Sequence, residues 1–306
     1  MPDDTATDFS NLIRPFPVPA MLTGAGNIEG LLPRLWRVRE RVKAGRMPGI
    51  ATGVPSLDKH LGGLQTGVHL LAASPGAGKT SLALQIARRA AADGVSVVYL
   101  AFDEGGDRLA LKLVAAQGGM PFGRFLMGTA DPDELLPVLD KHHDLLARIR
   151  IYNGPASILP ADAVAMLAEA RQIDGTGEGL IVIDFLQSWA ARLDSANDFR
   201  LAVTHLVGGL RQAALAAQVP VLAIAAQNRT GQNEAALSSL RESSDLEYVA
   251  DTITFMTTSS DDQSEPRRRI SLACRKNRFG ATFDAELVFD AERGVFAEDR
   301  RPGFTI

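Results

Sequence analysis

One stretch, Ala73-Ser74-Pro75-Gly76-Ala77-Gly78-Lys79-Thr80-Ser81, constrains the fold of this chain more than any other. It fits the phosphate-binding loop pattern of Ala or Gly, four further residues, then Gly, Lys and Ser or Thr. The apolar run 68–72 before it predicts a buried strand, and apolar residues at helical spacing over 82–90 predict a helix after it. The loop therefore joins a strand to the N-terminus of a helix, which is the context that this pattern requires.

The loop residues suit a nucleotide with magnesium. Glycines let the backbone turn its N–H groups toward phosphate oxygens, and the helix dipole adds positive potential there. Lys79 supplies a charge for the β- and γ-phosphates, and the Thr80 hydroxyl can bind Mg²⁺. We therefore expect ATP and Mg²⁺ as ligands. The predicted nucleotide-binding residues are Ser74, Pro75, Gly76, Ala77, Gly78, Lys79, Thr80 and Ser81.

Apolar strands alternate with helical patterns through the middle of the chain. The predicted strands are residues 96–101, 148–153, 180–184 and 220–225, and the predicted helices include 107–116, 132–147 and 161–171. Continuous apolar runs indicate strands that are covered on both faces, hence a parallel sheet. Short strands are predicted at 252–256, 270–274 and 285–289. The fold class is α/β, a mostly parallel, doubly wound sheet with helices on both faces and short C-terminal strands.

Three regions are predicted along the chain. Residues 1–27 form an irregular arm, residues 28–49 a helix and linker, and residues 50–306 the main domain. The helix, at about 28–44, carries apolar side chains on one face. That face packs either on its own domain or on a neighbouring subunit, and the pattern does not decide between them. The face consists of Leu31, Leu35, Val38 and Val42.

Composition limits the possible partners and location. The net charge of −4 gives no overall attraction to nucleic acid, so any such binding must come from local basic loops. Cys274 is the only cysteine, which excludes an internal disulfide and suits a reducing cytoplasm. No apolar run reaches membrane-spanning length, and the N-terminus lacks a basic signal-peptide start. We expect a cytoplasmic protein with no membrane partner.

Acidic residues end two of the predicted strands. Asp184 closes the strand 180–184 and can hold Mg²⁺ beside Thr80. Asp103 and Glu104 follow the strand 96–101, at the sheet edge where ligands of such folds bind. Neighbouring residues of a strand face opposite ways, so only one of the two can activate the attacking water. We favour Glu104 for its longer reach, with Asp103 as the alternative.

Four segments, in order between about residues 50 and 298, resemble a known family. They are Thr52-Gly53 through Gly62-Gly63-Leu64, Ile183-Asp184-Phe185-Leu186-Gln187, Leu240-Arg241-Glu242-Ser243-Ser244 with Leu246-Glu247 and Ala250-Asp251, and Lys276-Asn277-Arg278-Phe279-Gly280. Together they are similar to the C-terminal ATPase domain of the DnaB-type replicative helicases, within the RecA/KaiC class of P-loop ATPases. Only the arm and one helix precede the ATPase domain in this sequence, so we expect no counterpart of the family's N-terminal helical domain.

The resemblance implies further sites and partners. Lys276 and Arg278 would reach the γ-phosphate bound by a neighbouring subunit, with Arg278 as arginine finger. The active unit would be a homo-oligomeric ring, a hexamer, with replication proteins as further partners. Gln187 and Gln227 are candidate γ-phosphate sensors, although Gln227 stands one place later than the family's glutamine. The residues expected to line a channel for single-stranded DNA are Arg229, Arg241, Glu242 and Ser244.

Two features depart from the family and keep alternatives open. The family's glycine after Arg-Glu-Ser is Ser244 here, and spacing to Leu109 aligns Asp103 with the family's single glutamate. A separate basic run, residues 267–269, is interpreted as a solvated loop.

The first functional hypothesis is an ATP-driven ring helicase. The second is a RecA/KaiC-like ATPase that switches or remodels protein partners, and the third is a nucleotide-dependent interaction module with little turnover.

Overall fold

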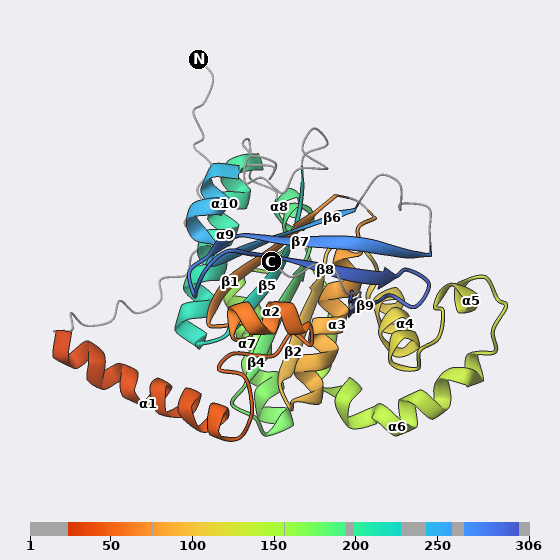
Figure 1. The fold of residues 1–306 in the computed structure, drawn as a ribbon, viewed down its shortest axis with the longest axis horizontal. Helices are drawn as coiled ribbons and strands as arrows, with labels where there is room; N and C mark the ends of the chain where they lie inside the picture. Colours follow the sequence, from red (N-terminus) through yellow and green to blue (C-terminus); the bar gives the residue numbers. More distant parts are fainter. Residues whose placement is uncertain are drawn as a thin grey trace, which may run out of the picture.

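The computed structural model describes residues 24–74, 76–155, 157–193, 199–227, 243–258 and 266–299. Its strands are β1 (Gly67–Ala73), β2 (Ser96–Ala101), β3 (Ile149–Asn153), β4 (Gly179–Asp184), β5 (Pro220–Ala226), β6 (Thr252–Thr258), β7 (Arg267–Asn277), β8 (Phe283–Asp290) and β9 (Val295–Glu298). They form one central sheet in the order β3-β2-β4-β5-β1-β6-β7-β8-β9 (Figure 1). The strands from β3 to β6 in that order are parallel, and β7, β8 and β9 are antiparallel. The predicted mostly parallel sheet is confirmed.

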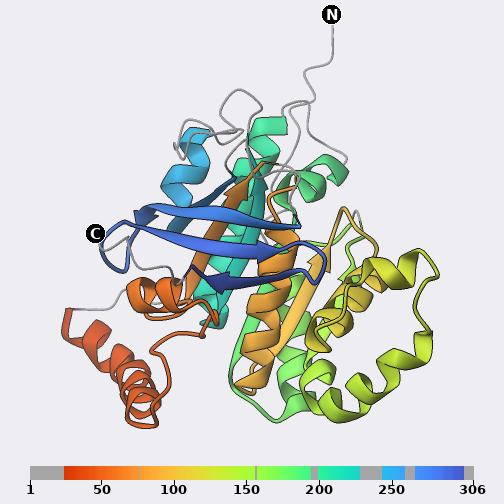
Figure 2. The ribbon, with the colours of Figure 1, turned by 45° about the vertical axis from the view of Figure 1, so that its right-hand side comes forward.

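Helices cover both faces of this sheet. One face packs on α2 (Pro55–Leu61), α3 (Lys79–Ala92) and α4 (Gly106–Gln117), and the other on α7 (Pro160–Asp174), α8 (Leu186–Arg192) and α9 (Phe199–Ala217). The remaining helices are α1 (Gly24–Lys43), α5 (Gly123–Leu126), the 3-10 helix η2 (Pro132–Leu135), α6 (Leu136–Ala147) and α10 (Ser243–Val249). In Figure 2, α3 lies across the sheet, and the segment from α4 to α6 projects to one side.

The apolar runs of the sequence explain the two layers of the core. All residues of β1, β2 and β4 are buried, as expected for strands with helices on both sides. Side chains pointing one way meet α3, and those pointing the other way meet α7 and α9. Small residues on α3, among them Ala83 and Ala87, are fully buried and let the helix approach the sheet closely. The phosphate-binding stretch is therefore held between two well-packed elements.

The predicted boundaries differ from the observed ones mainly in the short elements. The helix expected at 28–44 is α1, which begins at Gly24 and continues through Pro33. The short helices α8 and α10 and the strand β9 were not predicted. The interpretation of residues 267–269 as a solvated loop is wrong, because these arginines open β7. Two of these charges are stabilised in the strand by ion pairs, Arg267 with Asp290 and Arg269 with Asp299.

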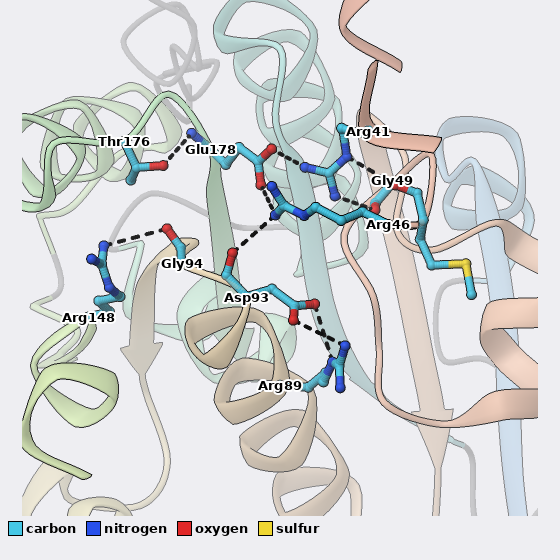
Figure 3. A network of polar contacts seen from close by, with 10 residues as sticks. Arg41, Arg46, Gly49, Arg89, Asp93, Gly94, Arg148, Thr176 and Glu178 are labelled. Atoms are coloured by element: carbon cyan, nitrogen blue, oxygen red, sulfur yellow. Dashed lines mark hydrogen bonds and ion pairs between the residues drawn. The ribbon is translucent and has the colours of Figure 1, made fainter. Parts of the chain in front are cut away.

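The C-terminal end of α1 is attached to the core by an arginine network (Figure 3). Arg41 pairs with Glu178 and donates to Gly49 O at 2.8 Å, while Arg46 donates to Glu178 Oε2 at 2.8 Å and to Asp93 O at 3.0 Å. Burial raises the pKa of Glu178, but Arg41 and Arg46 together lower it by more than burial raises it. The net shift of the Glu178 pKa is therefore downward. The charged carboxylate therefore holds α1 to the loop before β4.

The apolar face predicted for α1 does not pack on the main domain. Leu31 is 37% exposed, Leu35 50% and Val42 51%, and only Val38 is partly covered. Three further apolar side chains on the same helix are also exposed, namely Ile28, Leu32 and Trp36. In Figure 1 the helix points away from the sheet. Among the described residues, no helix combines the length and apolar character needed to cross a membrane.

Candidate active site

The phosphate-binding loop runs from the end of β1 to the start of α3. Gly76 and Gly78 both have positive φ, at 80° and 88°, and Gly78 is the N-cap of α3. A Cβ atom on Gly78 would lie 2.8 Å from Phe296 Cζ and 2.9 Å from Phe289 Cε1. Glycine is needed here for both its backbone angle and the close approach of this aromatic pair. Ser74 and Ala77 are buried in the loop, and Pro75 lies outside the described residues.

The Lys79 side chain lies over the loop, and its ammonium group is partly buried. Its Nζ donates to Ala73 O at 2.9 Å and to Ser74 O at 2.8 Å. Burial lowers the pKa of Lys79 to about 8, against the charges of Asp184 and Asp103, which raise it. A polyphosphate is the kind of ligand that would stabilise the charged form of such a lysine.

Asp184 lies at the end of β4 and is buried. It accepts a hydrogen bond from the Tyr99 hydroxyl at 2.7 Å. Burial raises the pKa of Asp184, against hydrogen bonds from Tyr99 and Thr80 that lower it. The Thr80 hydroxyl and the Asp184 carboxylate are hard oxygen donors placed side by side, which fits Mg²⁺. Tyr99 was missed from the sequence, because nothing distinguishes it from the other large residues of a buried strand.

The acidic pair after β2 is divided between two environments. Asp103 lines an open cavity of about 430 Å³ together with Lys79 and Thr80. Glu104 instead pairs with Lys112, Nζ to Oε2 2.6 Å, and with Arg108, Nε to Oε1 3.3 Å. The sequence-based preference for Glu104 as water-activating base is not supported by this geometry. Asp103 is the carboxylate that faces the phosphate loop.

The cavity contains most of the predicted nucleotide-binding residues and two unpredicted cations. Of the predicted residues, Gly76, Gly78, Lys79, Thr80 and Ser81 line it, as does Asp184. Lys112 and Arg268 also line it, beside Phe122, Phe185, Ala226, Phe289 and Ala291. Lys112 lies on α4, soon after Asp103 in the sequence, whereas Arg268 comes from the distant strand β7.

The two candidate sensors lie beside the loop. Gln187 is 5% exposed, and its Oε1 accepts from Ala226 N at 3.0 Å. Its Nε2 is buried and has no hydrogen-bond partner among the described residues. Gln227 is 4% exposed, and its backbone N–H donates to Ala73 O, the carbonyl that also accepts from Lys79. Both side chains thus stand where β5 meets the loop.

Lys276 and Arg278 lie at the opposite end of the strands from the phosphate loop of the same chain. Asn277, at the end of β7, is paired with Thr252 at the start of β6, and Thr252 is paired with His69 near the start of β1. The phosphate loop follows the other end of β1. The structure therefore does not bring these two cations to their own chain's phosphate loop.

Both cations bind the end of α10. Lys276 Nζ donates to Glu247 O, and Arg278 Nη2 donates to Tyr248 O at 2.7 Å. Arg278 Nη1 also pairs with Asp251 Oδ1 at 2.9 Å. Burial and the neighbouring Arg278 lower the pKa of Lys276. Helix C-terminal carbonyls attract positive charge, so this arrangement holds the pair together at one position.

The residues predicted to bind DNA fall largely outside the described chain. Arg229, Arg241 and Glu242 belong to residues 228–242, which the structure does not describe. Ser244 lies in the first turn of α10. This helix ends at Val249, next to the carbonyls that hold Lys276 and Arg278.

Comparisons with known proteins agree with the fold. Residues 49–298 match the family model of the DnaB-like helicase C terminal domain. The chain is 27% identical over 299 residues to the replicative DNA helicase DnaB of Leifsonia xyli subsp. xyli, covering 90% of this chain and 64% of that protein. It is also 27% identical over 266 residues to DnaB of Geobacillus stearothermophilus, covering 84% of this chain and 58% of that protein. The chain thus spans less than two thirds of either relative.

A solved structure gives the same picture of the fold. A DnaB-like replicative helicase, whose structure was solved with its interactions with primase, superposes with a TM-score of 0.70 at 24% identity. The match covers 86% of this chain and 65% of that chain. At this identity the likeness shows the fold alone, which is RecA-like.

Proposed function

Because the chain belongs to the DnaB-like helicase C-terminal domain family, we propose that it is an ATP-hydrolysing motor. It works as a hexameric ring that moves along single-stranded DNA. One observation carries the shared-site part of this proposal. The phosphate loop lies at one end of the central strands and the Lys276/Arg278 pair at the other end. A ring of repeated head-to-tail contacts can bring the loop of one subunit to the cation pair of the next.

Each side chain of the site then has a role in phosphoryl transfer to water. The phosphate loop and Lys79 bind the β- and γ-phosphates, and Thr80 and Asp184 would hold Mg²⁺, which would supply further positive charge beside the phosphates. Asp103 accepts a proton from the attacking water. Arg278 and Lys276 of the neighbouring subunit stabilise the charge that spreads over the transferred group. Gln187 and Gln227 contact the γ-phosphate from the side of β5.

Asp103→Asn should lower single-turnover ATP hydrolysis by about 10²–10⁴-fold while the Kd for ATP changes little. The reason is that the change removes the basic carboxylate from the cavity and keeps its shape. Glu104→Gln is the matched control, because Glu104 is engaged with Lys112 and Arg108. Loss of hydrolysis in Glu104→Gln with normal hydrolysis in Asp103→Asn would reverse the assignment.

The exposed apolar residues of α1 support contact between subunits. Its end is fixed to the core through Glu178, while Leu31, Leu35 and Trp36 are at least 37% exposed. An apolar strip of this kind is costly in water and marks an interaction surface. We assign it to the neighbouring subunit of the ring.

DNA binding through residues 228–242 should be governed by phosphate contacts. We expect affinity for single-stranded DNA to fall linearly on a log–log plot against salt, with a slope of about −0.7 per phosphate contact, and to depend little on sequence. Arg241→Ala should weaken DNA binding and DNA-stimulated ATP turnover and leave ATP binding intact. Arg124→Ala is the control, because it removes an exposed arginine on α5 that pairs with Glu134. Equal DNA affinity of wild type and Arg241→Ala would remove this loop from the interface.

A second candidate function is an ATPase that switches or remodels protein partners without unwinding. The net charge of −4 favours it, because a DNA motor gains from a positive surface. The two functions are separated by measuring ATP turnover and particle size with and without single-stranded DNA, and strand separation on a forked duplex. A ring whose ATP turnover is unchanged by single-stranded DNA, and which does not separate the strands of the duplex, would support the second function.

A further inference from the structure

The three arginines that open β7 face two different environments. Arg267 pairs with Asp290, Nε to Oδ2 3.4 Å, and Arg269 pairs with Asp299, Nε to Oδ2 3.7 Å. Alternate residues of a strand share a face, so Arg268 points the other way. Its side chain lines the cavity of the phosphate loop. The sequence run of three like charges thus contains one residue with a separate role.

Arg268 contacts the phosphate loop directly. Its Nη2 donates to Gly76 O at 2.9 Å, and its guanidinium carbon lies 5.3 Å from the centre of the Phe289 ring. Phe289 is buried, stacks on Phe296 at 4.3 Å, and is one of the two rings that Gly78 approaches most closely. The arginine and the loop therefore rest on the same aromatic surface. A cation over an aromatic face is held electrostatically and keeps its orientation.

We propose that Arg268 binds the polyphosphate of the nucleotide in the same chain, as a second cation beside Lys79. The inference rests on the proposed nucleotide site but not on a ring or on DNA. A guanidinium is planar and permanently charged, and it binds phosphate oxygens through several N–H groups. The contact with Gly76 O places this group at the loop that receives the phosphates.

Asp103 and Asp184 are the carboxylates that face the same cavity. With Lys79 alone, the positive charge of the loop would be offset by these two carboxylates. Arg268 and Lys112 bring further positive charge to the lining of this cavity. Lys112 is paired with Glu104, whereas Arg268 donates to Gly76 O of the phosphate loop itself, so its guanidinium lies where a polyphosphate anion would bind.

The test compares Arg268→Gln and Arg268→Lys with Arg267→Gln. The control removes the neighbouring charge of the same strand, whose side chain is 73% exposed. Binding of ATP, of inorganic tripolyphosphate and of adenosine is measured by calorimetry, with the melting temperature of each variant recorded without ligand. We expect Arg268→Gln to weaken ATP and tripolyphosphate equally, by about tenfold to hundredfold. Arg268→Lys should recover part of this loss, and Arg267→Gln should bind both ligands as wild type does.

Other outcomes would overturn the inference in distinguishable ways. Unchanged binding by Arg268→Gln would exclude a ligand contact. A loss for ATP without a loss for tripolyphosphate would assign Arg268 to the ribose or base instead. Weaker binding of all three ligands together with a lowered melting temperature would show that Arg268 stabilises the loop and does not contact the ligand. If wild-type protein bound neither ATP nor tripolyphosphate, the proposed nucleotide site itself would fail, and the inference with it.

Discussion

Arg278→Ala should bind ATP normally and turn it over about 10³–10⁵-fold more slowly than wild type, the range known for arginine fingers. The side chain lies at the opposite end of the strands from its own phosphate loop, so we expect its loss to affect the neighbouring site. Steady-state ATP turnover and the Kd for ATP are the two measurements needed. Arg275→Ala is the control, because Arg275 is three residues away, on β7, and pairs with Asp284.

Mixing experiments distinguish a shared site from a site within one chain. A mixture of Arg278→Ala and Lys79→Ala subunits should recover part of the activity that each variant lacks. In a mixed ring, an intact Lys79 of one subunit can meet an intact Arg278 of the next. A fully active monomer, or no recovery in rings shown to exchange subunits, would contradict a shared site.

Lys79→Ala should abolish measurable ATP turnover. The ammonium is held at the phosphate loop by Ala73 O and Ser74 O, and it lines the cavity where the β- and γ-phosphates would bind. Lys59→Ala is the control, because Lys59 is an exposed lysine on α2. Normal turnover in Lys79→Ala would refute the assignment of the site.

The same lysine makes a prediction about pH. Its pKa of about 8 is below the ordinary value of 10.5, so the charged form predominates only below about pH 8. ATP pairs with the charged form and would raise the pKa, so binding takes up a proton at higher pH. Wild-type affinity for ATP should be steady below about pH 8 and fall as the pH rises above it. Lys79→Ala should lack this fall, and a flat wild-type profile across roughly two pH units centred near that pKa would contradict it.

The long elements of the fold could be predicted because their burial produces apolar patterns in the local sequence. β1, β2 and β4 are buried along their whole length, and α3 buries Leu82, Ile86 and Ala90 at helical spacing. The short helices α8 and α10 have seven residues each, too few for a period of 3.6 to be recognised. Tertiary contacts rather than local pattern determine such elements.

The site was predictable where it is contiguous in sequence and not where it depends on register. Lys79, Thr80 and Asp184 follow from a loop and a strand end. The direction of Glu104 depends on Arg108 and Lys112, one and two turns further along the chain on α4, whose long side chains pair with it. The length of a side chain does not reveal such partners, so the sequence leaves the choice between Glu104 and Asp103 open.

Arg268 shows the same limit more clearly. Its contact with Gly76 joins residues 192 positions apart, and it exists only because β7 lies beside β6 in one particular register. The alternation of Arg267, Arg268 and Arg269 could have suggested two faces, had the segment been recognised as a strand. Three adjacent charges are typical of loops, and the acidic partners that stabilise them here are on β8 and just beyond β9.

The length of β7 has a consequence for how neighbouring sites communicate. From Arg268 to Arg278, one residue past the end of β7, the chain spans roughly 30 Å, with one end against its own phosphate loop and the other at the opposite end of the strands. On the two assignments proposed for these arginines, one strand contacts the nucleotide of one subunit and the nucleotide of the next. We therefore expect nucleotide binding at either site to affect the other, because coupling between two sites is reciprocal.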